Sequence, residues 1–470
     1  MRLCNKCFDI ERKLKSMTNM SGETKKDCKG TVIFFSMDAL GHIHPILSIV
    51  KELKRRGYRA IILTTRPLNG RKRLEEMGIE LEHCTDVETE KSEEKPMTSD
   101  DALKAIMIPL IDNFRKGCVE AYEAAYRIDG AVGKHLDDMI KNHDLIEAKM
   151  RSLNPDLIVY DHVIGIPCIT RVAKKWVRVY SGFPIALYSS INENCISGLG
   201  LRPADEMTPK WKEFEVKNKG PLRQKIREFW TAKGEQDWPL ELDLTPTSPH
   251  LNFYLGPKEL GLEQIEKFKP LPESSWFRLE HTIDDGNFCG QFELPEKLTK
   301  CSGKLVYFSL GTLVTCDTNL INRLLTILSK SENKFIISMG QMHKYIKLYE
   351  NMWGEKFIDQ KAVLRKADLF ITHGGHNSII EAFYYGVPGL IVLPVFADQF
   401  DSAQRVQDCG FGYRLNPFEC TETELLKAVD SILADKELAK RMKTVSSRLK
   451  AIKYHEIAVD KLVPLINSPL

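Results

Sequence analysis

Polar side chains surround a short apolar run between Leu369 and Gln399, with types and spacing that could bind an anion. Leu369 to Thr372 predicts a buried strand of a parallel sheet. His373-Gly374-Gly375 ends that strand, and Asn377 or Ser378 can cap the helix that follows. Glycines let the backbone approach a ligand, and the free N–H groups and dipole of a helix start favour an anion, most often a phosphate. The stretch therefore predicts a phosphate site.

Further polar groups reach the same edge of the predicted sheet. Gly386-Val387-Pro388 ends the helix, and Leu390 to Leu393 predicts the next strand. Glu381 lies in the helix, and Asp398 and Gln399 follow the second strand. Carboxylate and amide groups beside a phosphate suit a sugar nucleotide, because ribose and hexose hydroxyls need acceptors.

Strands and helices alternate in both halves of the chain, which predicts an α/β fold with parallel sheets. Thr31 to Phe35 predicts a strand, Pro45 opens a helix, and Tyr58 to Thr64 predicts the next strand. Lys304 to Leu310 and Lys334 to Ser338 restart the pattern in the second half. The turn after the first strand, SMDALGH, lacks G-x-G-x-x-G, which argues against a dinucleotide oxidoreductase.

A length of 470 residues fits two α/β domains. Prolines and glycines between about 256 and 300 predict a linker. A charged segment over 72–100 predicts a loop, and residues 200–250 predict a partly helical insertion. We expect a flexible leader over 1–29, an N-terminal domain over 30–265, a linker over 266–300, a C-terminal domain over 301–450, and a tail over 451–470 that packs back on the first domain.

Composition describes an ordinary globular protein, with 43% hydrophobic and 28% charged residues. A formal net charge of +3 gives no case for nucleic acid as a partner. No apolar run is long enough for a membrane anchor, and the first twenty residues lack the apolar core of a secretory signal. We expect a cytoplasmic monomer. Cys4 and Cys7 form a CNKC pair, but a zinc site needs four ligands and no second pair follows at suitable spacing.

The polar stretch resembles the donor-binding motif of the UDP-glycosyltransferase family, in both order and spacing. The matching residues are Phe357, Gln360, His373, Gly375, Ser378, Glu381, Gly386, Pro388, Asp398 and Gln399. The similarity extends over both domains from about residue 31. It implies the GT-B fold, in which two Rossmann-like domains face each other, with the acceptor bound by the first domain and the UDP-sugar by the second.

The resemblance also implies a role for each donor-side residue. Gln360 and the backbone near Ile358 would bind uracil, with Phe357 stacking on the base, and Glu381 would bind the ribose hydroxyls. His373 would bind the diphosphate. The remaining expected contacts are Gly375, Asn377, Ser378 and Thr312 beside the diphosphate, and Asp398 with Gln399 on the hexose hydroxyls. Such members need no metal or other cofactor, since the UDP-sugar is a co-substrate.

Three positions depart from the family pattern. Phe357 stands where tryptophan usually stacks on uracil, so stacking is expected with less area. Asp359 replaces a proline, and His376 replaces the tryptophan of plant members on the sugar side. Donor preference is therefore the least defined property.

The catalytic base implied by the resemblance falls on His42, in Gly41-His42-Ile43-His44-Pro45. On residues alone, a histidine before a helix is more often a cap or a surface group. Imidazole can take the proton of an acceptor hydroxyl near neutral pH. Asp161 ends a strand over Leu157 to Tyr160 and would orient His42, although an aspartate there could instead cap the next helix.

These features predict an inverting UDP-glycosyltransferase that moves a hexose, expected to be glucose, to a hydroxyl of a small lipophilic acceptor such as a phenol, flavonoid or xenobiotic. A GT-B epimerase or sugar-nucleotide hydrolase is the first alternative, since either would keep the donor site. A non-catalytic UDP-sugar-binding subunit is the second, although His42 and Asp161 are both present.

Overall fold

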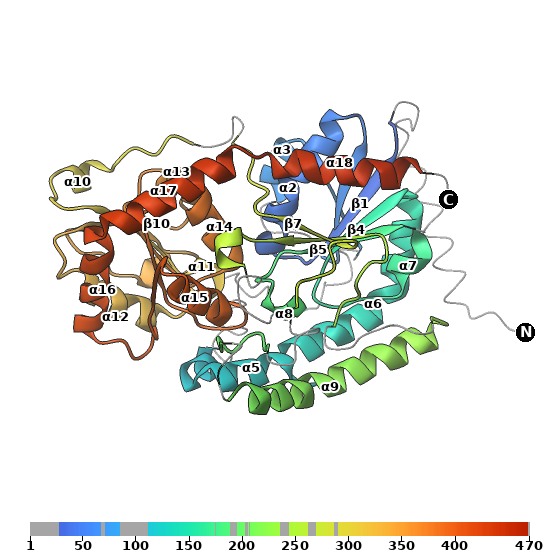
Figure 1. Ribbon diagram of the computed structural model, residues 1–470, viewed down its shortest axis with the longest axis horizontal. Helices are drawn as coiled ribbons and strands as arrows, with labels where there is room; N and C mark the ends of the chain where they lie inside the picture. The colour runs from blue at the N-terminus through green and yellow to red at the C-terminus, as the bar shows by residue number, and fades with distance from the viewer. Residues whose placement is uncertain are drawn as a thin grey trace, which may run out of the picture.

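The computed structural model describes residues 28–66, 71–84, 111–173, 175–188, 195–202, 205, 207–235, 244–261, 269–285 and 290–468. The predicted leader lies outside these ranges except for residues 28–29, as does its CNKC pair. The loop predicted over 72–100 is wrong where the structure describes it, because residues 72–84 hold most of a helix and a strand of the first sheet. Two domains stand side by side, each built around its own parallel sheet (Figure 1). The predicted α/β fold is confirmed.

The first sheet has, over the described residues, seven parallel strands in the order β3-β2-β1-β4-β5-β6-β7. They are β1 (Thr31–Ser36), β2 (Arg59–Thr64), β3 (Glu80–His83), β4 (Leu157–Asp161), β5 (Trp176–Tyr180), β6 (Leu251–Leu255) and β7 (Trp276–Leu279). The central strands β1 and β4 are buried along their whole length, because helices cover both faces of the sheet. Their register pairs Ser36 with Asp161 at the carboxyl edge.

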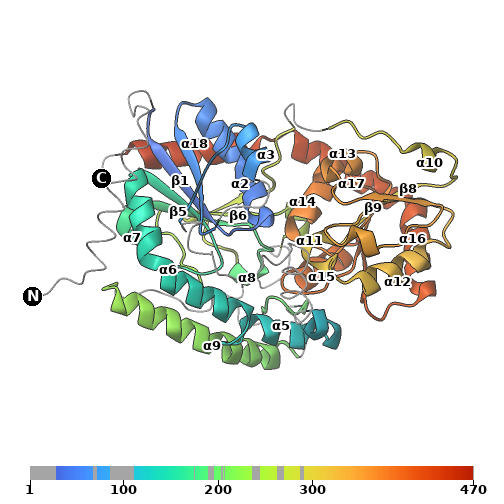
Figure 2. The same cartoon turned by 180° about the vertical axis from the view of Figure 1, so that it is seen from behind.

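The helices of this domain follow from apolar periodicity and are longest on the face shown at the bottom of Figures 1 and 2. They are α2 (Leu40–Arg55), α3 (Arg71–Glu76), α5 (Cys118–Tyr126), α6 (Ala131–Leu153), α7 (Cys168–Val172), α8 (Ile185–Tyr188), α9 (Thr208–Ala232) and the 3-10 turn η2 (Lys258–Leu260). The helix α9 is the predicted insertion, which is more fully helical than expected, and it packs against α5 and α6.

The second sheet has, within the same described ranges, six parallel strands in the order β10-β9-β8-β11-β12-β13. They are β8 (Leu305–Ser309), β9 (Lys334–Ser338), β10 (Met352–Glu355), β11 (Leu369–Thr372), β12 (Leu390–Val392) and β13 (Gly412–Arg414). The other elements are α10 (Glu296–Thr299), α11 (Gly311–Val314), α12 (Thr318–Leu328), η4 (His343–Tyr345), α13 (Gln360–Leu364), α14 (His376–Tyr385), α15 (Gln399–Asp408), α16 (Glu422–Ala434), α17 (Lys436–Lys450) and α18 (Tyr454–Asn467).

The chain passes between the domains twice, after β7 and again between α17 and α18. The expected linker over 266–300 begins too early, because its residues 276–279 form β7 and extend the first sheet. The last helix, α18, lies across α2 and β7 of the first domain (Figure 1). Arg448 of α17 donates to Glu280 at 2.6 Å, and the Tyr454 hydroxyl of α18 donates to the same carboxylate at 2.8 Å. His281 bonds the Leu449 carbonyl at 2.9 Å.

A buried carboxylate also joins the domains through α15. Asp401 accepts from the backbone N–H of Gly198 at 2.5 Å and of Gly200 at 2.9 Å. Both glycines have positive φ, 88° and 64°, so their N–H groups can converge on one side chain. Burial raises the Asp401 pKa to about 7, against the opposing effect of these two hydrogen bonds. The segment around residue 199 is thereby fixed to the second domain.

Candidate active site

Helix α2 brings His42 to the domain interface. It begins at Leu40, so the expected start at Pro45 is wrong and His42 lies in the first turn. Pro45 inside the helix has no N–H, which leaves the carbonyl of Gly41 without its usual partner four residues on. The side-chain amide of Asn377, in the first turn of α14, donates to that carbonyl. The two elements predicted to carry base and donor site therefore touch directly.

His42, Asp161 and Ser181 form one hydrogen-bonded cluster. Asp161 ends β4 and Ser181 follows β5, so both lie at the carboxyl edge of the sheet. His42 Nδ1 lies 3.4 Å from Asp161 Oδ2 and 2.9 Å from Ser181 Oγ, which lies 3.0 Å from Asp161 Oδ1. Burial lowers the His42 pKa, but the charge and hydrogen bond of Asp161, with the charge of Asp398, outweigh it and raise the pKa above 6.5. The structure thus pairs His42 with Asp161, and sequence analysis missed Ser181, whose one signal was its place directly after a buried strand.

His373 lies in a narrow slot between two glycines. A methyl group added at Gly311 or at Gly375 would stand 2.6 Å from His373 Nε2, well inside contact distance. Burial lowers the pKa of His373 to about 4. Without a ligand the ring is therefore neutral at pH 7, and its hydrogen bond to the Ser309 backbone opposes the effect of burial. Gly375 itself is the N-cap of α14.

Gln360, Ser378 and Glu381 are brought together behind this turn. The Gln360 amide donates to Glu381 Oε2 at 2.7 Å and to Ser378 Oγ at 3.2 Å. Burial raises the pKa of Glu381, partly offset by Lys361 and by the Gln360 hydrogen bond. Glu381 as a residue is 92% buried. Among the described residues only its Oε2 receives a side-chain hydrogen bond, so Oε1 can accept from a diol.

Phe357 and Ile358 line a hollow of about 660 Å³ at the start of α13. The Phe357 ring is 68% exposed, so a flat ligand could stack on it. Asp359 is the N-cap of α13 and accepts from Ala362 N–H at 3.2 Å, which explains how an aspartate replaces the proline of the family pattern. Phe370, by contrast, is fully buried in the core.

Asp398 and Gln399 stand at the start of α15, and their side chains bond to different parts of the molecule. Asp398 Oδ2 accepts from the Phe183 N–H of the first domain at 2.9 Å. Gln399 is buried, and its side-chain oxygen accepts from Val395 N–H at 3.0 Å, so this oxygen holds the turn and only the amide nitrogen is left for a ligand. Ala397 has φ 53°, an uncommon left-handed value that sets the direction of this turn.

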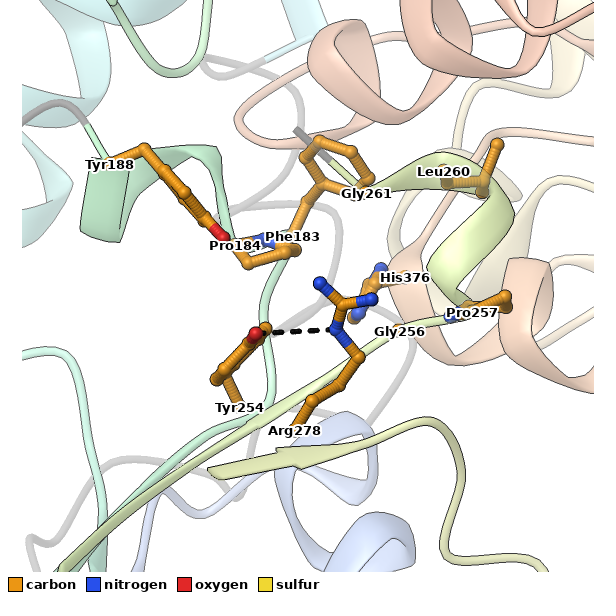
Figure 3. Close-up of a pocket in the computed structure, with 10 residues that line it drawn as sticks. All are labelled: Phe183, Pro184, Tyr188, Tyr254, Gly256, Pro257, Leu260, Gly261, Arg278 and His376. Carbon is orange, nitrogen blue, oxygen red and sulfur yellow. Dashed lines mark hydrogen bonds between the residues drawn. The ribbon is translucent and has the colours of Figure 1, made fainter. Parts of the chain in front are cut away.

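His376, at the position of the plant tryptophan, is bonded to the first domain. Its Nε2–H donates to the carbonyl of Leu255 in the first domain at 2.9 Å, and its ring meets Phe183 edge to face at 5.5 Å. Figure 3 shows it closing a small pocket against Tyr254 and Arg278. His373 and His376 therefore lie in different surroundings: His373 lies between two glycines, and His376 contacts the first domain. Thr312 lies in α11, and its side chain is outside the described residues.

Residues 293–454 match the family model for UDP-glucoronosyl and UDP-glucosyl transferase. This range holds all the donor-side residues described above. The chain thus matches the UDP-glycosyltransferase family over its second domain. It is a family 1 glycosyltransferase and an enzyme of that class, which removes the non-catalytic binding subunit from the alternatives.

Relatives in Bacillus subtilis extend the similarity across nearly the whole chain. NDP-glycosyltransferase YjiC is 25% identical, with 89% of this chain and 93% of the relative aligned. A second relative, named "Uncharacterized UDP-glucosyltransferase YdhE", is 23% identical, with 93% of this chain and 99% of the relative aligned. Both therefore span the His42 domain as well as the donor domain.

Solved glycosyltransferase structures share the fold. The glycotransferase of kitacinnamycin superposes with a TM-score of 0.65 at 18% identity, covering 94% of this chain and 99% of that one. VinC, solved in complex with dTDP, gives 0.58 at 16% identity, covering 93% and 99%. The UDP-glycosyltransferase thus has the predicted GT-B fold. None of the helices in the described ranges combines the length and apolarity that crossing a bilayer requires.

Proposed function

We propose that this UDP-glycosyltransferase transfers a hexose from a UDP-sugar to a hydroxyl of a small lipophilic acceptor, with inversion at the anomeric carbon. The observation that carries the proposal is the contact of Asn377 with the Gly41 carbonyl, which places the base-bearing turn of α2 against the start of α14. His42 follows Gly41 directly. An acceptor held beside His42 therefore lies next to a sugar whose diphosphate is bound at α14.

The reaction follows from these positions. His42 Nε2 takes the acceptor's hydroxyl proton while the oxygen attacks the anomeric carbon from the face opposite the phosphate. One carbon–oxygen bond forms, the bond to the phosphate oxygen breaks, and UDP leaves. A single displacement of this kind inverts the anomeric centre. Asp161 favours the imidazolium that forms, as its effect on the His42 pKa indicates.

The donor side is proposed to work without a metal ion. The first N–H groups of α14 and a ring N–H of His373 would donate to the diphosphate, and the helix dipole opposes its charge. Phe357 and Gln360 would bind uracil, Glu381 the ribose, and Asp398 with the free amide nitrogen of Gln399 the hexose. We propose glucose as the hexose, supported by the glucosyltransferase names of its relatives.

The test is mass spectrometry of products from phenol and alcohol acceptors with UDP-glucose, UDP-galactose, UDP-glucuronate and UDP-N-acetylglucosamine, with and without EDTA. His42→Ala is expected to lower turnover at least a hundredfold, the usual share of a general base, while UDP still binds in calorimetry. His44→Ala is the matched control, since His44 lies two residues on and is exposed. Near-normal turnover of His42→Ala would disprove the mechanism. UDP release that needs no acceptor would indicate a hydrolase instead.

A further inference from the structure

We propose that Ser181 is a positioning residue that transmits the orienting effect of Asp161 to His42. The inference rests on the proposed role of His42 as base and adds a third group to it. Direct contact between the other two side chains is poor, since 3.4 Å between His42 Nδ1 and Asp161 Oδ2 exceeds the usual range for an N–H···O bond. Both distances to the Ser181 hydroxyl, 2.9 Å and 3.0 Å, lie within that range.

The chemistry of the three groups fixes the direction of both hydrogen bonds. An ionised carboxylate can only accept, so the single hydroxyl proton of Ser181 points to Asp161. A lone pair of the Ser181 oxygen then faces His42 Nδ1. Nδ1 must carry a proton to bond it, because an unprotonated Nδ1 would oppose lone pair to lone pair. Ser181 therefore selects the tautomer with a free Nε2, which is the form that acts as a base.

The surroundings hold Ser181 in this place. Its side chain is 95% buried, and it follows β5, which is paired with β4. Two residues later, the Phe183 N–H donates to Asp398 of the second domain at 2.9 Å. The serine is thus anchored on one side by the sheet and on the other by the facing domain. No proton passes through it, since His42 keeps its Nδ1 proton throughout the reaction.

Ser36 offers a matched control at the same sheet edge. It is 99% buried and stands opposite Asp161 in the β1–β4 register. Its hydroxyl has no hydrogen-bond partner among the described residues. Ser36→Ala removes the same atoms from an equally buried site without removing a hydrogen bond of the His42 cluster, so its kcat is expected to match the wild type.

Ser181→Ala is expected to lower kcat about tenfold to a hundredfold, the value of a hydrogen bond to a charged group, with KM for the UDP-sugar unchanged. Ser181→Thr keeps the hydroxyl and should recover most of the rate. Ser181→Cys keeps the size but offers only a weak donor and acceptor, so it should behave like Ala. If Ser181→Ala does not fold, Ser181→Cys takes its place in every measurement.

Two further readouts separate positioning from a structural effect. In the Asp161→Ala background, Ser181→Ala should cost little more, because the two groups act through one chain of bonds. In ¹⁵N spectra of ring-labelled enzyme above the His42 pKa, the wild type should show His42 protonated at Nδ1, and Ser181→Ala should gain the Nε2–H form. Additive losses, or an unchanged tautomer, would overturn the inference. If His42→Ala is inactive while Ser181→Ala turns over normally, only this inference fails; if His42→Ala is active, the proposed function fails.

Discussion

Gly311→Ala tests whether the slot around His373 is needed for donor binding. Gly311 has φ 72°, where an L side chain is strained by roughly 1–2 kcal/mol. A methyl group there would stand 2.6 Å from His373 Nε2. Relief to an ordinary contact of 3.4 Å requires the ring to move by about 0.8 Å, the difference of those two distances. A hydrogen bond from His373 to a phosphate would not survive such a shift in good geometry.

The expected loss is that of one hydrogen bond to a charged group, about 1.5–3 kcal/mol, or roughly tenfold to a hundredfold in the Kd for UDP. Titration calorimetry with UDP measures it. Gly78→Ala is the matched control, because Gly78 has φ 74° and nothing within 4 Å of the added methyl group. Urea denaturation should show a loss of stability in both variants from the same backbone strain, and a larger loss in Gly311→Ala, where the displaced ring adds to it.

Only Gly311→Ala should also lose UDP affinity. Equal UDP binding by the two alanine variants would refute the reasoning that His373 contacts the diphosphate from this slot. A loss of affinity in Gly78→Ala of the same size would show that the effect comes from general destabilisation.

Three more predictions follow from the titratable groups. Because the base must be unprotonated, kcat/KM should fall as pH falls through the raised pKa of His42, which places the acidic limb of the profile above pH 6.5. Asp161→Asn should move that limb to lower pH. A limb that stays in place would contradict the pairing of His42 with Asp161. Glu381→Ala should raise the Kd for UDP about tenfold or more, and for uracil itself very little. Because the folded-state pKa of Asp401 is raised, its protonation stabilises the fold fully below pH 3.8, and this contribution is lost as pH rises through about 7. Between those pH values, the free energy of unfolding measured by urea titration should therefore fall less in Asp401→Asn than in the wild type.

The sequence was most informative where one short stretch contains a whole unit. β11 spans the predicted Leu369 to Thr372, and the strand at Lys334 to Ser338 also has its predicted bounds. Each is a short, mostly apolar run with a glycine two residues after its end. β7, β10 and β13 were missed, because they have only three or four residues with mixed polarity and depend on neighbouring strands for pairing.

The donor-side residues could be predicted because they follow one another closely in sequence. Their contacts with the first domain could not, because the partners lie far away in sequence. Ser181 gains its importance from residues 139 and 20 positions away, which no local pattern records. The contact of His376 could not be predicted for the same reason, since its partner, the Leu255 carbonyl, belongs to the other domain. Pro45 was recognised as a helix-start residue. The Gly41 carbonyl, which Pro45 leaves without a helical donor, is bonded by Asn377, and this contact is visible only in the structure.

The double crossing of the chain between the domains has a mechanical consequence. Glu280 follows the last strand of the first sheet, and Arg448 and Tyr454 flank the return of the chain, so both crossings are tied at one carboxylate. A rotation that separated the domains would pivot at this point and leave it nearly still. Such a rotation would break the hydrogen bonds that Asn377, Asp398, His376 and Asp401 make to the first domain. It would open the edge that carries the chemistry, with the Glu280 junction as its hinge.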